Sequence, residues 1–164
     1  MHKVNDFIVY KHDVCKIKEV RNNMLNGTTY YIMTPIDDES LIIDVPSDNR
    51  MGWIRSLISL EEANELINNI PNIKPLKNIN DKNIETTYKE LLNNGSHNEL
   101  IQIIKTSYLR NEERINNKKK ISDKDDKYFK LAEKYLYNEL SIVLSKSFDE
   151  TKEYIIKKVQ ENIG

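Results

Sequence analysis

The pattern of residues along this chain changes once, within Leu41–Ser59. Before this stretch, short runs of β-branched and aromatic residues alternate with turns rich in Asn, Asp and Gly. After it, apolar residues recur at intervals of three and four, as they do on a helix. Because the two patterns follow one another without mixing, we expect an α+β fold with domains at residues 1–58 and 59–164.

The first part predicts short strands at residues 7–10, 14–20, 28–33, 41–45 and 53–58. Asn26-Gly27 between the second and third of these is a strong signal for a hairpin. On the second strand Cys15 and Ile17 share a face, which indicates that both belong to a core. Strands this short, in meander order, predict a small, strongly bent sheet or barrel.

The second part predicts about four to five helices, at 60–69, at 82–93, after Ser96, after Ser122 and at 149–162. Ser59 with Glu62, and Ser96 with Glu99, have the spacing of capping boxes. A connector at about 70–80 contains two prolines. The helices carry apolar stripes: Leu100, Ile103, Ile104, Tyr108 and Leu109; Phe129, Ala132, Leu136, Leu140 and Val143; and Tyr154, Ile155 and Val159.

No arrangement of reactive residues indicates an enzyme. Cys15 has His12 three residues away, but a strand would point the two side chains in opposite directions. The three histidines have no metal-ligand spacing, and no Gly-rich phosphate loop is present. We therefore expect no catalysis, no small-molecule substrate, no metal and no cofactor.

Charge and hydropathy give expectations about the surroundings of the chain. The formal net charge is −1, so the whole chain exerts no general attraction on nucleic acid. No apolar run approaches the roughly 20 residues of a membrane span, and the first residues lack the apolar core of a signal peptide. A single cysteine requires no oxidising compartment. We expect a cytoplasmic protein without a membrane partner.

Three features could bind a partner, and each has a purely structural alternative. An exposed edge of the sheet could pair with a partner strand, or the sheet could be an ordinary capped one. Residues 84–89 open a helix and could bind phosphate, or Ile84, Tyr88 and Leu91 could form a core stripe. The third feature is a group of cations, which could contact DNA or form a solvated face: Arg110, Arg114, Lys118–Lys120, Lys127, Lys130 and Lys134.

Trp53, the single tryptophan, lies near the change of pattern. A tryptophan at such a junction is typical of a packing anchor with one polar atom. A wedge between base pairs is the alternative. We interpret Trp53 as an anchor.

Several segments together resemble the CarD/CdnL family of bacterial transcription regulators. They are Phe7–Tyr10, Val14–Val20, Gly27, Tyr31-Ile32, Leu41–Pro46, Gly52 and Ile54–Ser59, followed by Tyr88-Lys89, Arg110–Arg114, Ser122 and Glu139-Leu140. The resemblance covers nearly the whole chain, and its most specific parts are Val45-Pro46 and Arg55–Ser59. The first module is also similar to the polymerase-interacting domain of the transcription-repair coupling factor.

The resemblance implies a Tudor-like β-domain that binds the β-subunit of RNA polymerase through a sheet edge. It implies a helical domain that grips promoter DNA near the upstream edge of the melted region. The expected outcome is a changed stability of the open promoter complex, brought about by a monomer that joins the nucleoid through the polymerase. One alternative is an adaptor that binds polymerase but whose helical domain recruits protein instead of DNA. The other is an enzyme whose catalytic residues the sequence does not reveal.

For the polymerase contact, the resemblance points to Arg21 or Asn23 at the end of the second strand and to Asp44 before the Val-Pro pair. The family has a basic residue where Asp44 stands, so an acidic polymerase surface would repel this chain at that point. Arg50 and Arg55 are the neighbours from which the contact could be rebuilt.

For the DNA contact, Ile84 occupies the position of the family's wedge tryptophan. Thr86 and Thr87 replace two basic residues, whereas Tyr88 and Lys89 match the family. Lys127 and Lys130 complete the expected DNA-binding residues. Compared with the family, we expect a contact that is weaker, more salt-sensitive or differently placed.

Overall fold

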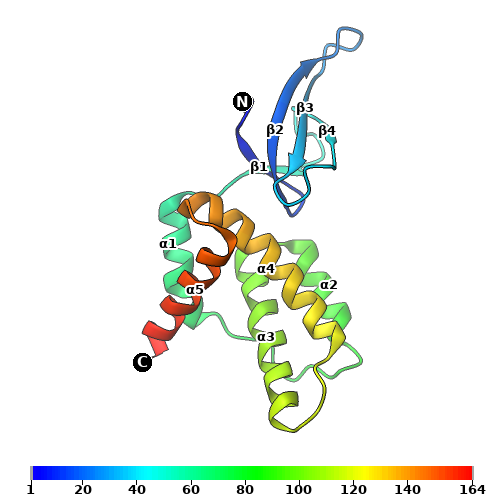
Figure 1. Cartoon of the computed structure of the whole chain (residues 1–164). Helices are drawn as coiled ribbons and strands as arrows, with labels where there is room; N and C mark the ends of the chain where they lie inside the picture. Colours follow the sequence, from blue (N-terminus) through cyan, green and yellow to red (C-terminus); the bar gives the residue numbers. More distant parts are fainter. Residues whose placement is uncertain (1, 164) are drawn as a thin grey trace. The chain divides into compact units, whose positions relative to one another are not determined.

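A computed structural model of the chain describes the backbone of residues 2–163 and side chains as far as residue 158. The chain divides into two compact units, residues 1–58 and residues 59–164. The first unit is a β-sheet and the second is helical, so the expected α+β fold is confirmed (Figure 1). We call them the sheet unit and the helical unit.

Within the described residues, the sheet unit contains one antiparallel sheet of five strands: β1 (Phe7–Tyr10), β2 (Asp13–Asn22), β3 (Thr29–Pro35), β4 (Ile43–Pro46) and β5 (Ile54–Ser56). All five lie where the sequence predicts strands. Their order is β4-β3-β2-β1-β5, so the first four form a meander. The fifth departs from the expected meander because it returns to pair with β1 instead of β4.

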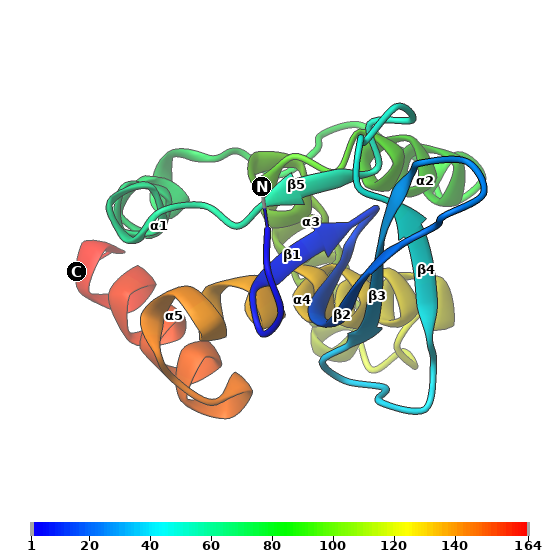
Figure 2. The same cartoon turned by 90° about the horizontal axis from the view of Figure 1, so that it is seen from above.

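The sheet curls around one small core, as Figure 2 shows. The register between β2 and β3 shifts between Ile17 and Glu19, and a bulge of this kind bends a strand. Gly27, at φ 70°, closes the β2–β3 hairpin predicted from Asn26-Gly27. The core residues alternate along the strands: Ile8, Cys15, Ile17, Tyr31, Met33, Val45 and Ile54. Cys15 and Ile17 therefore belong to a core, as expected.

The described part of the helical unit has five α-helices and one 3-10 helix: α1 (Leu60–Asn69), η1 (Ile70–Asn72), α2 (Ile84–Asn94), α3 (His97–Asn116), α4 (Asp123–Leu144) and α5 (Phe148–Ile163). Helices α3 and α4 run side by side (Figures 1 and 2). Helix α2 begins two residues later than predicted. The backbone N–H of Asn83 bonds to Asn80 instead, which makes the preceding residues a turn.

Serine side chains begin three of these helices. Ser59, Ser96 and Ser122 each accept a hydrogen bond from the backbone N–H three residues later. Only Ser59 forms the full reciprocal capping box within these three, because Glu62 also accepts from the Ser59 N–H at 3.1 Å. Gly95 ends α2 in the left-handed conformation, where a glycine costs least.

The buried face of α3 differs from the predicted stripe. Leu100 and Ile103 are buried, but Tyr108 and Leu109 are about half exposed, at 56% and 49%. Thr106 and Ser107 take the buried positions instead. Their hydroxyls find backbone partners, since Ser107 donates to the Ile103 carbonyl at 2.6 Å and Thr106 accepts from the Leu76 N–H.

On α4, Ala132, Leu136 and Leu140 are buried as predicted, and Phe129 and Val143 are partly buried. On α5, Ile155 is buried and Tyr154 partly buried. The side chain of Val159 lies outside the described residues.

Candidate functional site

An open depression at one end of the sheet brings together three of the five residues predicted to bind polymerase. It has a volume of about 520 Å³ and is lined by Arg21, Asn22, Asn23, Met24, Tyr30 and Asp44. The strand register explains the grouping, because Arg21 on β2 pairs with Tyr30 on β3, and Asp44 on β4 pairs with Ile32 of β3. We call these six residues the sheet-edge surface.

The charge of Arg21 is largely balanced within its own strand. Its guanidinium donates two hydrogen bonds to the Glu19 carboxylate, at 2.9 and 3.1 Å. Glu19, followed by a weaker effect of Asp44, raises the pKa of Arg21. The sheet-edge surface therefore presents one cation, Arg21, which is paired with the neighbouring Glu19, and one carboxylate, Asp44, instead of the basic patch that the resemblance implies.

Strand β4 forms one free edge of the sheet. The Ser47 N–H donates to the Thr29 carbonyl at 2.8 Å, which indicates that odd-numbered residues of β4 direct their backbone groups to β3. The backbone groups of Asp44 and Pro46 consequently face outward. Because proline has no N–H, this edge offers a partner strand one donor at Asp44 and carbonyl acceptors at both residues.

Arg50 and Arg55 do not line this depression. Arg50 lies in the turn between β4 and β5 and is held by Asp48, with 2.8 Å between Nε and Oδ2. Arg55 lies on β5, the strand at the opposite end of the sheet order, where it pairs with Val9. The structure does not group either residue with Asp44.

Trp53 packs on its own sheet. Its ring meets Tyr10 edge to face at 6.1 Å between centroids, and the Lys11 ammonium lies 4.6 Å from the ring centre. The side chain stays 39% exposed. These contacts favour the anchor interpretation over the wedge.

Two of the predicted DNA-binding residues lie in the core of the helical unit. Ile84 is 1% exposed and Tyr88 is fully buried. The Tyr88 hydroxyl donates to Asp125 Oδ1 at 2.7 Å, and its ring packs on Tyr128 at 5.3 Å between centroids. In this conformation Ile84 has no surface to insert between bases, which favours the alternative of a core stripe. The third buried residue of the stripe is Leu92, whereas the predicted Leu91 is partly buried.

Tyr88 belongs to a buried polar network centred on Asp125. Arg110 Nε donates to both carboxylate oxygens of Asp125 at 3.2 Å, and its Nη2 donates to Asp81. Arg114 reaches the second oxygen of Asp81 at 3.4 Å. Burial, followed by the bond to Asp125, raises the pKa of Tyr88. Both arginines, which the sequence analysis placed on a basic surface, are therefore paired with aspartates.

A second group of predicted residues does lie on the surface, where α2 and α4 begin. Lys89 and Lys124 lie 3.2 and 4.0 Å from the Glu85 carboxylate. Lys89 and, more weakly, Lys124 and Lys127 lower the pKa of Glu85. Two exposed ammonium groups thus lie within 4.0 Å of one carboxylate, and the exposed Lys127 acts on it more weakly. We call Lys89, Lys124 and Lys127 the lysine surface.

The remaining predicted DNA-binding residues differ in whether their polar groups already bond within the protein. Thr86 is exposed. The Thr87 hydroxyl donates to the Asn83 carbonyl at 3.1 Å, inside its own helix. Lys130 pairs with Asp126 at 2.9 Å one turn away. Thr86 is therefore the member of this group whose side chain can most readily meet a phosphate.

Sequence reasoning missed Lys124, Asp81 and Asp125. Lys124 precedes Lys127 by three residues, a spacing that places both on one helical face. For Asp125 no local signal exists, because its partner Tyr88 is 37 residues away. Asp81 is likewise 29 residues from Arg110.

Cys15 has the properties of a core residue. It is fully buried, and burial raises the pKa of its thiol to about 12, so the nucleophilic thiolate is disfavoured at neutral pH. Among the described residues, no three or more His, Cys, Asp or Glu side chains group as metal ligands. None of the helices, as far as residue 163, has the length and apolar character to cross a membrane.

No model of a known protein family matches this sequence. No curated protein is similar enough to count as a relative. Membership of the CarD/CdnL family therefore stays a prediction that depends on the segments quoted above.

Proposed function

We propose that this chain is a transcription regulator that binds the β-subunit of RNA polymerase through the sheet-edge surface. The observation that supports it most is the grouping of Arg21, Asn23 and Asp44 beside the open edge of β4. An open edge can accept a partner strand through backbone hydrogen bonds, while the neighbouring side chains select the partner. The identity of the partner comes from the resemblance.

The charges of Arg21 and Asp44 determine which charges the partner surface can have. Asp44 stands on the exposed edge, and Arg21 is already engaged with Glu19. A basic or neutral side chain opposite Asp44 would be attracted or tolerated, whereas an acidic one would be repelled. We infer that the polymerase lobe recognised by this chain lacks the acidic surface expected for the family.

We further propose that the helical unit holds promoter DNA through the lysine surface, with Lys89 at its centre. Exposed ammonium groups contact phosphates and position a protein on DNA without reading its sequence. Each phosphate contact adds about 0.9 to the steepness of the salt dependence. The factor would then alter the lifetime of the open complex by backbone contacts alone, without a side chain inserted between bases.

Binding of the full chain to a fragment of the polymerase β-subunit tests the first contact. Asp44→Arg should change the affinity several-fold, because it reverses the charge beside the outward-facing backbone groups. Glu39→Arg makes the same change of charge at an exposed loop residue that does not line the depression, and it should bind like the unmodified chain. Equal affinities for all three proteins would rule out this edge as the interface.

The lifetime of the open promoter complex tests the second contact. Replacing Lys89, Lys124 and Lys127 together by Gln should abolish the effect of the factor and reduce the salt slope of DNA binding by about 3. The same change at Lys3, Lys77 and Lys157 is the matched control and should leave the lifetime effect in place, since these lysines are also exposed but belong to none of the predicted DNA-contacting groups. An unchanged lifetime for the first variant would contradict DNA contact through the lysine surface.

The burial of Ile84 and Tyr88 favours a second candidate, the adaptor whose helical unit recruits protein. In that case the full chain binds the β-subunit fragment but leaves the open-complex lifetime unchanged even at low salt. Loss of binding to the polymerase fragment together with an unchanged lifetime would exclude both functions.

A further inference from the structure

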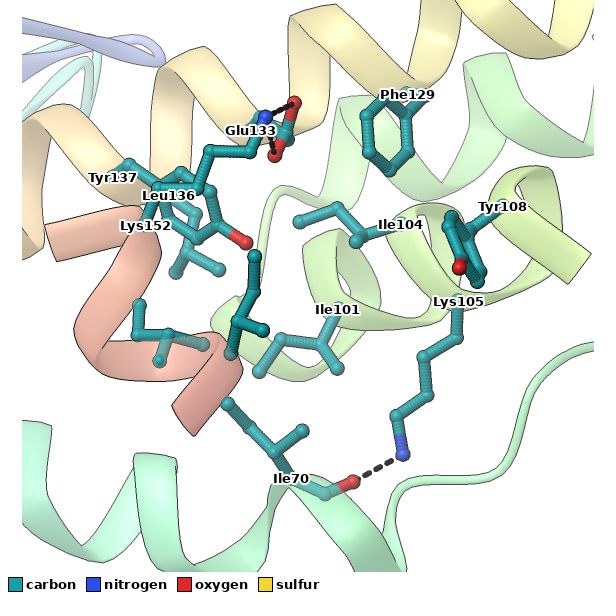
Figure 3. Close-up of a pocket in the computed structure, with 12 residues that line it drawn as sticks. Ile70, Ile101, Ile104, Lys105, Tyr108, Phe129, Glu133, Leu136, Tyr137 and Lys152 are labelled. Atoms are coloured by element: carbon teal, nitrogen blue, oxygen red, sulfur yellow. Dashed lines mark hydrogen bonds and ion pairs between the residues drawn. The ribbon is translucent and has the colours of Figure 1, made fainter. Parts of the chain in front are cut away.

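The helical unit contains an apolar cavity that neither proposed surface uses. It lies among α3, α4, α5 and η1 and has a volume of about 480 Å³ (Figure 3). This is within the range of about 300–1,000 Å³ that is typical of small-molecule sites. Its walls are mostly aliphatic, with Ile101, Ile104, Leu136, Ile155 and Ile156 among them.

Two charged side chains in the cavity wall, Glu133 and Lys152, form an ion pair with no net charge. Glu133 on α4 is buried, with its side chain 8% exposed, and Lys152 on α5 lies 3.3 Å from its carboxylate. Figure 3 shows this pair on one side of the cavity. Burial raises the pKa of Glu133, an effect that Lys152 partly offsets. The pair closes this side of the cavity without adding net charge.

Lys105 on α3 adds a second positive charge to the cavity wall, and the hydrogen-bond partners of its ammonium are not carboxylates. Its ammonium donates to the carbonyl oxygens of Ile70 and Ile73, the latter at 2.8 Å, and Figure 3 shows the bond to Ile70. These partners are neutral carbonyls, and burial and the nearby Lys74 both lower the pKa of Lys105. Since an ammonium has three N–H groups, one remains for a further acceptor.

We propose that this cavity binds an amphipathic carboxylate, with an alkyl chain among the isoleucines and the carboxylate on Lys105. Two lysines and one glutamate line the cavity, so a ligand with one negative charge restores neutrality. A carboxylate also supplies the acceptor for the free N–H, and charge-assisted bonds of this kind are among the stronger ones. An alkylammonium would bring a like charge beside Lys105 and be repelled. The site is independent of the proposed polymerase and DNA contacts.

Calorimetric titration of the full chain with decanoate, decanol and decylammonium, each below the concentration at which it forms micelles, tests the inference. Decanoate should bind saturably and about tenfold or more tightly than decanol, because only it forms the charged bond. Decylammonium should bind more weakly than either. Equal affinity for decylammonium and decanoate would overturn the assignment of the carboxylate to Lys105.

Two variants locate the site. Lys105→Gln keeps a donor for the backbone carbonyls but removes the charge, so the preference for decanoate over decanol should disappear within that variant. Ile156→Trp places a larger ring at the rim, where Ile156 is 44% exposed, and should abolish binding of all three compounds. Ile115→Trp adds the same ring to an isoleucine that is 60% exposed and does not line the cavity, and it should bind normally.

Three results would contradict the proposal. Unchanged decanoate binding by Ile156→Trp would place the ligand elsewhere, and a retained preference for decanoate in Lys105→Gln would remove Lys105 from the site. Absence of saturable binding to the folded, unmodified chain would show that the cavity does not accept such ligands and would leave an apolar partner segment as its occupant.

Discussion

None of the predicted binding residues of the sheet unit is buried, whereas two of the seven predicted in the helical unit are buried. In the sheet unit, Arg21 and Asp44 are exposed beside an open edge. In the helical unit, Ile84 and Tyr88 are in the core. The difference follows from geometry, because this sheet is not closed and leaves backbone groups of β4 unpaired within it, whereas a packed helix turns its apolar stripe toward its neighbours. An apolar residue at helical spacing is therefore stronger evidence for packing in the core than for a contact with DNA.

The largest effect is expected at Asp125, the centre of the buried network. Asp125→Ala should lower the free energy of unfolding by about 3–5 kcal/mol, because it leaves the partly buried Arg110 guanidinium without one of its carboxylates. Chemical denaturation followed by far-ultraviolet circular dichroism measures the change in the helical unit.

Asp123→Ala provides the control, since it removes an exposed carboxylate from the first turn of the same helix. It should cost less than about 1 kcal/mol, through its interaction with the helix dipole alone. Similar costs for the two variants would show that the Asp125 network contributes little to stability, and would weaken the contrast between a structural and a surface role.

Ile84→Ala should lower the free energy of unfolding by about 3 kcal/mol, as is usual for truncating a fully buried isoleucine. Asp44→Arg, at an exposed position of the sheet unit, should leave stability unchanged. Thermal or denaturant unfolding of both variants compares the two units directly. If Ile84→Ala kept full stability but lost the effect on promoter complexes, the wedge interpretation would be restored and the comparison would fail.

A smaller effect is expected for Tyr88→Phe, which keeps the ring on Tyr128 and deletes only the hydroxyl. Loss of its hydrogen bond to the buried carboxylate should cost about 2 kcal/mol. Because Tyr88 and Asp125 share this bond, the double variant with Asp125→Ala should cost less than the sum of the single changes. Strict additivity would mean that the hydroxyl is stabilised by some other group.

Local signals were enough to predict most of the fold. The strands and helices follow from β-branched runs, turns and serine caps, and Asn26-Gly27 predicts the hairpin. The return of β5 to β1 could not be predicted, because it depends on the curl of the whole sheet. The shifted face of α3 was also hidden, since Ser107 is polar and becomes a core residue only when its hydroxyl bonds within the helix.

The candidate site was predicted unevenly for the same reason. Arg21 and Asn23 are close in sequence, and the strand register brings Asp44 to them. Arg110 was expected to be exposed because it is a cation. Instead it is held by Asp81 and Asp125, which are distant in sequence. The sequence alone does not show which aspartate forms an ion pair with an arginine that is far away along the chain.

The smallest effects concern pH, and one group in each unit, His12 and Glu133, should contribute to stability in opposite directions. Burial lowers the pKa of His12 in the sheet unit below its ordinary value of 6.5, so below this pH the unfolded state binds protons first. The stability of the sheet unit should therefore fall as pH falls. Burial raises the pKa of Glu133 in the helical unit above 4.5, so above this pH the unfolded state loses its proton first, and the contribution of Glu133 to stability should fall as pH rises. Glu62, Asp81 and Glu85 of the same unit have lowered pKa values and contribute in the opposite direction. Trp53 fluorescence reports on the first unit and circular dichroism on the second.

His12→Gln should flatten the acid side of the profile measured by Trp53 fluorescence and leave the helical signal unchanged. Compared with the unmodified chain, Glu133→Gln should make the stability of the helical unit rise more steeply, or fall less, above the ordinary pKa of a glutamate, and leave the fluorescence profile as it was. A single variant that changed both profiles alike would show that the two units unfold as one. In that case the stabilities of the two units could not be measured separately. The two units would then differ only in how exposed their predicted binding residues are.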